Sequence, residues 1–160
     1  MRIRSFIPHD LARLTDLTIE TFGPFYEHSF RPLVGERVFA NQHGTWRADY
    51  VEQVAGLHDP DRHRYVAVAE IDGAVAGYVA WNVAPTRRNA EVTILAVAAG
   101  HRRYGTGSAL CAHAFDAMRD LGADVVTIGT GGDEFHAPAR ALYETLGCTA
   151  LPTAVYYREL

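Results

Sequence analysis

The stretch from residue 91 to residue 128 places the tightest constraint on the fold of this chain. Val92 to Val97 is apolar and β-branched enough for a central strand. A turn rich in glycine and arginine follows, and Gly105 to Leu121 then carries apolar residues at helical spacing up to a stop at Gly122. Val125 to Ile128 predicts a second buried strand. Such a strand–helix–strand unit pairs its strands in parallel with a right-handed connection, so we expect a parallel pair within the sheet.

The rest of the chain adds strands before this unit and helices around it. Arg2 to Ile7 predicts a first strand, and Tyr65 to Ile71 and Val75 to Asn82 predict a hairpin around Asp72-Gly73. The segment between residues 22 and 50 is expected to be irregular and is rich in aromatic side chains. The remaining predicted elements are a helix from Leu11 to Gly23-Pro24, a helix over Trp46 to Leu57, a helix from Pro138 to Gly147, and a last strand at Ala154 to Tyr157. The predicted fold class is therefore α/β, a central mixed sheet flanked by helices.

Length and composition limit what the chain can do. Its 160 residues predict one domain over residues 1–160. All 15 basic residues are Arg, which excludes a P-loop lysine and a Schiff-base lysine. The net charge of −4 disfavours a nucleic-acid partner. No apolar stretch is long enough for a membrane span, no signal peptide is visible, and Cys111 and Cys148 are too few for a disulfide framework. We therefore expect a cytoplasmic protein.

The turn between the predicted strand and helix is a candidate anion site. Helix N-termini leave backbone N–H groups unpaired and carry about half a positive charge. Gly105 and Gly107 allow an anion to approach that backbone, and Arg102 and Arg103 add charge. We expect a phosphate or pyrophosphate here; the alternative is a glycine-punctuated turn with two solvated arginines. A dinucleotide fingerprint is excluded because Leu110 stands where its third glycine would be.

Two motifs carry a family resemblance. Arg102-x-x-Gly105-x-Gly107 resembles the acyl-CoA loop of the GNAT superfamily of N-acetyltransferases, and Ala139-x-x-Leu142-Tyr143-x-x-x-Gly147 is similar to a second motif of that family. The order of predicted elements extends the resemblance over most of the chain, with its weakest part between residues 22 and 57. The sequence departs from the family pattern at His136, usually Asn, and at Cys148, often Phe.

The resemblance implies a fold, an activity and a set of binding residues. The activity would be transfer of an acetyl group from acetyl-CoA to a primary amine by direct attack in a ternary complex, without a metal. The acceptor would be a small amine or a protein N-terminus, and a homodimer is compatible with the family. The rival class is a non-catalytic acyl-CoA-binding or regulatory module on the same fold. The residues implied for acetyl-CoA are Leu95, Ala96, Val97, Arg102, Arg103, Tyr104, Gly105, Thr106, Gly107, Ser108 and His136.

Two residues are candidates for the proton transfers. Glu91 is the only charged residue between Asn89 and Gly100, so its carboxylate is expected to be desolvated and to serve as the general base. Its spacing from the loop also matches the base of some family members; the alternative is a solvated glutamate at a strand end. Tyr143 matches the family tyrosine that protonates the departing sulfur, and the alternative is a packing role.

Some residues keep several interpretations. His136 is a candidate base, a contact to pantetheine, or simply the residue at which a helix begins. Asp133 and Glu134 either bind a cationic acceptor or form an exposed acidic turn. The aromatic segment between residues 22 and 50 is either core or the wall of an acceptor pocket. A zinc site usually needs two pairs of closely spaced His or Cys residues, and no two such pairs occur in the sequence. No metal site is therefore expected.

Overall fold

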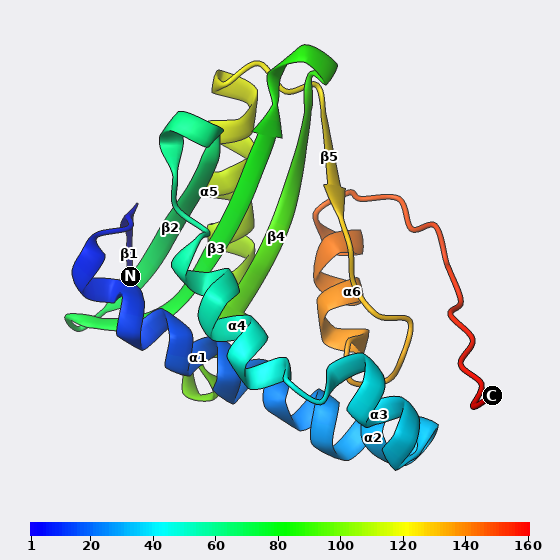
Figure 1. Cartoon of the computed structure of the whole chain (residues 1–160). Helices are drawn as coiled ribbons and strands as arrows, with labels where there is room; N and C mark the ends of the chain where they lie inside the picture. The colour runs from blue at the N-terminus through cyan, green and yellow to red at the C-terminus, as the bar shows by residue number, and fades with distance from the viewer.

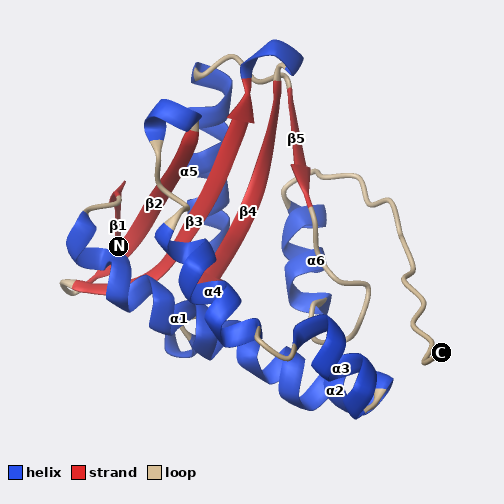
Figure 2. Ribbon diagram, viewed as in Figure 1, coloured by secondary structure: helices blue, strands red, loops and turns tan.

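The computed structural model describes residues 1–160 as a mixed sheet with helices on both faces (Figures 1 and 2). Its five strands lie in the order β1-β2-β3-β4-β5. The first four pair antiparallel with their neighbours, and β5 pairs in parallel with β4. This arrangement confirms the predicted mixed sheet. The strands are β1 (Arg2–Ser5), β2 (Arg64–Ile71), β3 (Ala74–Ala84), β4 (Asn89–Val97) and β5 (Val125–Ile128).

The helices divide between the two faces of the sheet. Figure 1 shows α5 behind the sheet and α1 with α4 in front of it, while α2 and α3 lie together beyond the end of α1. Short 3₁₀ turns cover residues 8–10, 60–62, 85–87 and 99–101. The longer elements are α1 (Leu11–Pro24), a π-helical turn η2 (Phe25–Phe30), α2 (Arg31–Val34), α3 (Glu36–His43), α4 (Trp46–Ala55), α5 (Thr106–Asp120) and α6 (Ala137–Thr145).

Alternation along the strands sends side chains into two separate cores. Val79 faces α5 and packs with Leu110, whereas Tyr78 faces α1 and packs with Leu17. Tyr78 is fully buried, and its hydroxyl lies 2.5 Å from the hydroxyl of Thr18 on α1. A buried hydroxyl needs such a partner, so this pair fixes α1 on the sheet and brings the end of α1 toward β4.

The expectation of irregular chain after Phe22 is wrong, because the segment continues as a helix. Pro24 lies inside α1, and the π-helical turn that follows carries the chain past it. Gly23 does not stop the helix: a Cβ at this position would lie 2.9 Å from the ring of Trp46, so the glycine permits close packing. A core of Phe30, Phe39 and Trp46 holds these short helices together. Tertiary packing therefore overrides the local Gly-Pro signal.

The predicted last strand at residues 154–157 is also wrong. The chain after α6 forms no helix or strand, and residues 149–160 are all exposed. Figure 1 shows this segment running away from β5, so β5 remains the edge of the sheet. A strand needs a neighbouring backbone with which to pair, whereas here Tyr157 only contacts the ring of Phe30 at 5.4 Å and Glu159 lies 3.7 Å from Arg37.

Candidate active site

The sheet opens between β4 and β5 at a β-bulge. Thr93 is the extra residue of the bulge, since Val92 and Ile94 on either side of it oppose adjacent residues of β3. The pairing of β4 with β5 ends at the same point, with Val92 opposite Ile128. A bulge bends its strand and increases the local twist, and Figure 1 shows β5 diverging from β4 toward the end of β5. The second half of β4 therefore has one edge without a strand partner.

Two of the three predicted β4 residues present their backbone at this open edge. Ala98 donates its N–H to β3 at 2.9 Å. Since alternate residues of a strand turn their backbone groups to the same side, Ala96 also faces β3, whereas Leu95 and Val97 face the opening. Arg102 confirms this direction, because its Nε donates to the carbonyl of Val97 at 2.9 Å. Ala96 does not reach the opening: its side chain lies in the core and its backbone pairs with β3.

The turn after β4 leaves a row of backbone N–H groups without protein partners. No N–H from Arg103 to Ser108 donates to another backbone group, and the first helical bond runs from Ala109 to Gly105 at 2.9 Å. Left-handed φ angles of 66° at Arg103 and 81° at Gly105 shape the turn. Successive N–H groups in such a turn, at the positive end of a helix, form a concave anion site. The geometry supports the anion site predicted from the sequence.

The side chains of this loop divide into an exposed and a packed set. Arg102, Arg103 and Tyr104 are exposed. Thr106 is buried, and its hydroxyl has no hydrogen-bond partner. Gly107 lies against α6, since a Cβ on it would be 3.2 Å from a methyl group of Leu142. The loop is therefore held from behind by α6 while its charged side chains face solvent.

Helix α6 brings Tyr143 to the opening. As predicted, Pro138 occupies the first turn of this helix. Tyr143 lines the cavity between the strands, and its hydroxyl bonds no protein group. Burial, with smaller contributions from the thiols of Cys111 and Cys148, raises the pKa of Tyr143 to about 12. The phenol therefore stays protonated at neutral pH, as a proton donor must.

A cavity of about 240 Å³ fills the opening between β4 and β5. Its walls come from β4, from the end of β5 and the loop after it, from α6, and from the aromatic segment. None of the fifteen lining residues is Asp or Glu. The aromatic segment thus serves both as core and as cavity wall. The aromatic wall consists of Phe22, Phe25, Tyr26 and Tyr50, with the two phenol oxygens 3.3 Å apart.

The expected desolvation of Glu91 is wrong. Its side chain is exposed, lies outside the cavity wall, and accepts only a long 3.4 Å hydrogen bond from Asn82. Val92 points to the α5 core, so Glu91 points to the other face of the sheet, where no helix covers it. The apolar residues next to Glu91 in the sequence suggested that its side chain would be buried. Burial of a strand residue depends instead on whether a helix packs on the face of the sheet to which its side chain points.

Asp133 and His136, two separate candidates in the sequence, form a pair in the structure that was not expected. Their side chains lie 2.7 Å apart, and His136 lines the cavity. The spacing of three residues after a glycine-rich turn was the available signal, because a helix start brings such residues together. Thr93 at the bulge and Gln53 on α4 were also missed as cavity residues. Neither has a signal in the sequence.

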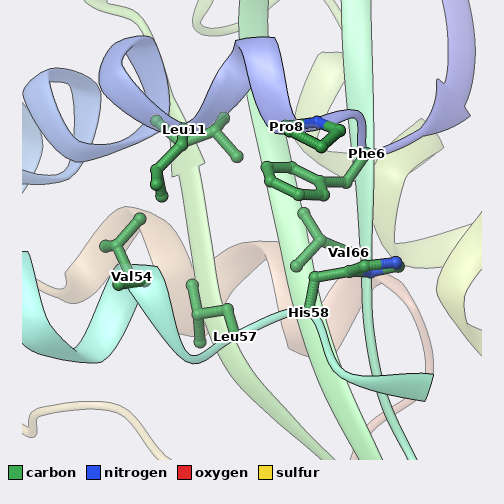
Figure 3. A pocket seen from close by; sticks show the side chains of 9 residues that line it. Phe6, Pro8, Leu11, Val54, Leu57, His58 and Val66 are labelled. Carbon is green, nitrogen blue, oxygen red and sulfur yellow. The ribbon is translucent and has the colours of Figure 1, made fainter. Parts of the chain in front are cut away.

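A second cavity of about 180 Å³ lies elsewhere, between the start of α1, the end of α4 and β2 (Figure 3). Figure 3 shows Phe6, Pro8 and Leu11 on one side of it and Val54, Leu57 and His58 on the other. Seven of its nine lining residues are hydrophobic, and none belongs to the predicted site. We interpret it as a gap in the packing of α1 and α4 against the sheet.

The model of the acetyltransferase (GNAT) family matches residues 12–148 of this sequence. The chain belongs to this family. It is therefore a GNAT acetyltransferase, as the two sequence motifs indicated. No curated protein matches the sequence.

Solved structures with the GNAT fold agree with this assignment. A GNAT-family protein from Desulfovibrio desulfuricans has a TM-score of 0.70 at 22% identity, over 94% of this chain and 86% of its own. An aminoglycoside N-acetyltransferase in complex with CoA has a TM-score of 0.69 at 14% identity, over 99% and 93%. A ribosomal-protein-alanine N-acetyltransferase from Brucella melitensis has a TM-score of 0.64 at 16% identity, over 99% and 100%. At these identities the likeness concerns the fold.

No group of three or more His, Cys, Asp or Glu side chains is arranged to hold a metal ion. No helix is both long and apolar enough to cross a membrane.

Proposed function

We propose that this GNAT protein transfers the acetyl group of acetyl-CoA to the primary amine of a small molecule, in a ternary complex. The observation that carries the proposal is the position of the open β4 edge. The backbone groups of Leu95 and the N–H of Val97, which no strand pairs with, lead into the row of unpaired N–H groups from Arg103 to Ser108. The Val97 carbonyl between them accepts from Arg102. One continuous surface of hydrogen-bond donors and acceptors thus extends from the cavity to the start of α5.

The groups present on this surface fit acetyl-CoA. The N–H groups at the start of α5 suit its pyrophosphate, and the exposed Arg102 and Arg103 add positive charge beside them. The amides of the pantetheine arm can pair with the backbone of Leu95 and with the N–H of Val97 in the manner of an added strand. The acetyl group would then reach the cavity, where Thr93 lies at the bulge.

The residues around the cavity support direct transfer. A backbone N–H at the open edge can polarise the thioester carbonyl as charge develops on its oxygen. Tyr143, protonated and unbonded to the protein, can protonate the departing sulfur. The buried thiol of Cys111 is a poor nucleophile, because burial, with a smaller effect of Cys148, raises its pKa to about 12. A covalent acetyl-cysteine intermediate is therefore not favoured.

The cavity walls favour a small acceptor with an apolar body. Residues from α1, η2 and α4 cover the opening on one side, whereas a protein N-terminus would need an open groove. Aromatic rings attract both apolar groups and a single ammonium group. Because no carboxylate lines the cavity, the site offers little to a polycation such as the acceptor of the aminoglycoside acetyltransferases.

The experiment that tests the proposal follows free thiol released from acetyl-CoA with a panel of amines. The panel contains 2-phenylethylamine, an aliphatic monoamine, an aminoglycoside and a short peptide with a free N-terminus. We expect thiol release with the aromatic or aliphatic monoamine. Binding of acetyl-CoA without thiol release for any amine would instead support the rival class, a non-catalytic acyl-CoA-binding module.

A homodimer stays a prediction from the family resemblance. The exposed apolar side chains of the C-terminal segment and the unpaired outer edge of β5 are the surfaces that an interface would use. Sedimentation velocity tests it directly, since a monomer of 17.6 kDa and its dimer differ twofold in mass.

A further inference from the structure

The loop between β5 and α6 holds an aspartate–histidine pair against the cavity. His136 Nδ1 lies 2.7 Å from Asp133 Oδ2, and the backbone N–H of His136 donates to Asp133 Oδ1 at 3.3 Å. One carboxylate therefore fixes both the backbone and the ring of the histidine. The side chains are 17% and 34% exposed respectively, so the histidine is the more buried of the two.

Neighbouring residues hold the pair in this geometry. A Cβ at Gly131 would collide with both the Asp133 carboxylate and the His136 ring, so a larger residue at that position would displace the pair. Arg140 on α6 donates from Nη1 to the carbonyls of Gly131 and Asp133, each at 2.6 Å. The guanidinium thus ties the loop to the helix without contacting the carboxylate itself.

The ring of His136 is packed so that its second nitrogen stays free. The Phe25 ring meets it edge-on, with the ring centroids 4.8 Å apart, so the loop packs directly on η2. His136 lines the same cavity as Thr93 and Tyr143. Its Nε2 bonds no protein group, whereas its Nδ1 is bonded to Asp133.

The carboxylate determines where the ring carries its proton. Burial alone would raise the pKa of Asp133, but the hydrogen bond and charge of His136 outweigh it and lower that pKa. An ionised carboxylate only accepts hydrogen bonds, so in the neutral form of the ring Nδ1 carries the proton and Nε2 holds a lone pair. This is the tautomer that a base facing the cavity requires.

We propose that His136 is the general base that deprotonates the acceptor amine and that Asp133 is its positioning residue. The inference rests on the proposed function, because it assigns a step of that same reaction. The alternative base, Glu91, is exposed and lies outside the cavity wall. His136 is therefore the base candidate that shares the cavity with the proton donor Tyr143.

The proton transfers balance over the reaction. The ammonium group gives one proton to Nε2, and the lone pair so released forms the C–N bond with the thioester carbon. The C–S bond then breaks, and its electron pair leaves with sulfur, which takes the proton of Tyr143. The surplus proton of the new amide nitrogen restores the phenol. His136 finally releases its proton to solvent.

Few other titratable groups surround the ring. Asp133 contacts Nδ1, the Arg140 guanidinium is bound to loop carbonyls, and Glu134 is exposed. On η2, the Glu27 carboxylate is turned to Trp46 and Arg31. The remaining groups around the cavity are the phenols of Tyr26, Tyr50 and Tyr143.

The first test compares His136→Gln and Asp133→Asn with the control His113→Gln, whose imidazole is exposed on α5. Thiol release is measured with 2-phenylethylamine between about pH 6 and pH 10, where the amine changes from largely protonated to largely free. We expect His136→Gln to lose about 100-fold or more of kcat near neutral pH, with the acetyl-CoA KM within about twofold. The loss should shrink toward pH 10, and Asp133→Asn should lose less.

A merely structural histidine would give a loss that is equal at every pH, and that result overturns the inference. Wild-type turnover in His136→Gln overturns it as well, as does a pH-dependent loss that appears in Glu91→Gln instead. If the wild-type protein releases thiol with none of the amines in the panel, the proposed function is contradicted, and with it this step. An active wild type with an active His136→Gln contradicts this step alone.

A second measurement needs no acceptor. Long-range ¹H–¹⁵N spectra of the imidazole groups, recorded on the full chain with CoA at about pH 8, report the tautomer of each neutral histidine. We expect the proton of His136 on Nδ1, and loss of this preference in Asp133→Asn. A neutral ring with its proton on Nε2 would present a donor to the cavity instead of a base, and would contradict the inference.

Discussion

Replacing Tyr143 with phenylalanine separates a chemical role from a packing role. The ring of Tyr143 packs on the cavity wall, but its hydroxyl bonds no protein group. Removing an unpartnered, partly buried hydroxyl changes stability by no more than about 0.5 kcal/mol. For a chain of this size that corresponds to less than about 2 °C in Tm. A proton donor to the leaving thiolate, by contrast, contributes about 100-fold or more to turnover.

We therefore expect Tyr143→Phe to lower kcat by about 100-fold while Tm and the acetyl-CoA Kd stay close to wild type. Thiol release, thermal unfolding and calorimetry measure the three quantities. Tyr156→Phe is the matched control, because this tyrosine is 93% exposed. A normal rate in Tyr143→Phe would refute the proton-donor role. A fall in Tm of many degrees would refute the reasoning that the hydroxyl has no structural partner.

Three further changes test the fold and the loop. Thr18→Val leaves the buried Tyr78 hydroxyl unpaired and should cost about 1–3 kcal/mol in denaturant unfolding; an unchanged midpoint would mean that the bond contributes nothing. Gly105→Ala places a side chain at a φ of 81°, where it meets no other atom but strains the backbone by about 1–2 kcal/mol. This strain should weaken CoA binding by about tenfold or lower Tm. Calorimetry that finds neither effect would contradict the loop geometry. The hydrogen bond from Arg4 lowers the pKa of Asp10 below its ordinary value of 3.8, so this pair stabilises the fold above about pH 4 and its contribution is lost as the pH falls through the lowered pKa. Asp10→Asn should therefore unfold more easily than wild type at pH 7, and the difference should narrow as the pH falls below about 4. A difference that stays constant in acid would argue against the ion pair.

The buried tyrosines make the stability of the fold fall at alkaline pH, whereas the Arg4–Asp10 pair makes it fall in acid. Burial raises the pKa of Tyr143 to about 12 and raises those of Tyr50 and Tyr78 further. Unfolded phenols ionise near pH 10, so stability is complete below that pH and is lost as the pH rises toward and beyond 12. Unfolding midpoints that stay constant from pH 9 to pH 12 would contradict this burial.

The strand–helix–strand unit could be predicted because its signals are local. The apolar run at Val92 to Val97, the glycine at residue 105 and the period of α5 all depend on neighbouring residues. The same is true of the unpaired N–H groups from Arg103 to Ser108, which are free because a helix begins there. The residues of this loop therefore have the geometry that the sequence indicates.

The features that were wrong or missed depend on contacts between distant segments. Pro24 is the last residue of α1, but helical structure continues directly into η2, and Gly23 packs against the ring of Trp46 from a distant part of the sequence. Glu91 is exposed because no helix covers its side of the strand, which the apolar residues around it in the sequence do not reveal. The bulge at Thr93 opens the sheet through its register against β3, and register is a property of two strands.

The central claim is that acetyl-CoA binds from the start of α5 to the open edge of β4. The most direct measurement is a titration of the ¹⁵N-labelled protein with CoA, followed through its backbone amide resonances. We expect the largest shifts at the N–H groups from Arg103 to Ser108 and at Leu95 and Val97, with smaller ones at Tyr143. An absence of binding, or shifts confined to the cavity beside Phe6 and His58, would contradict it.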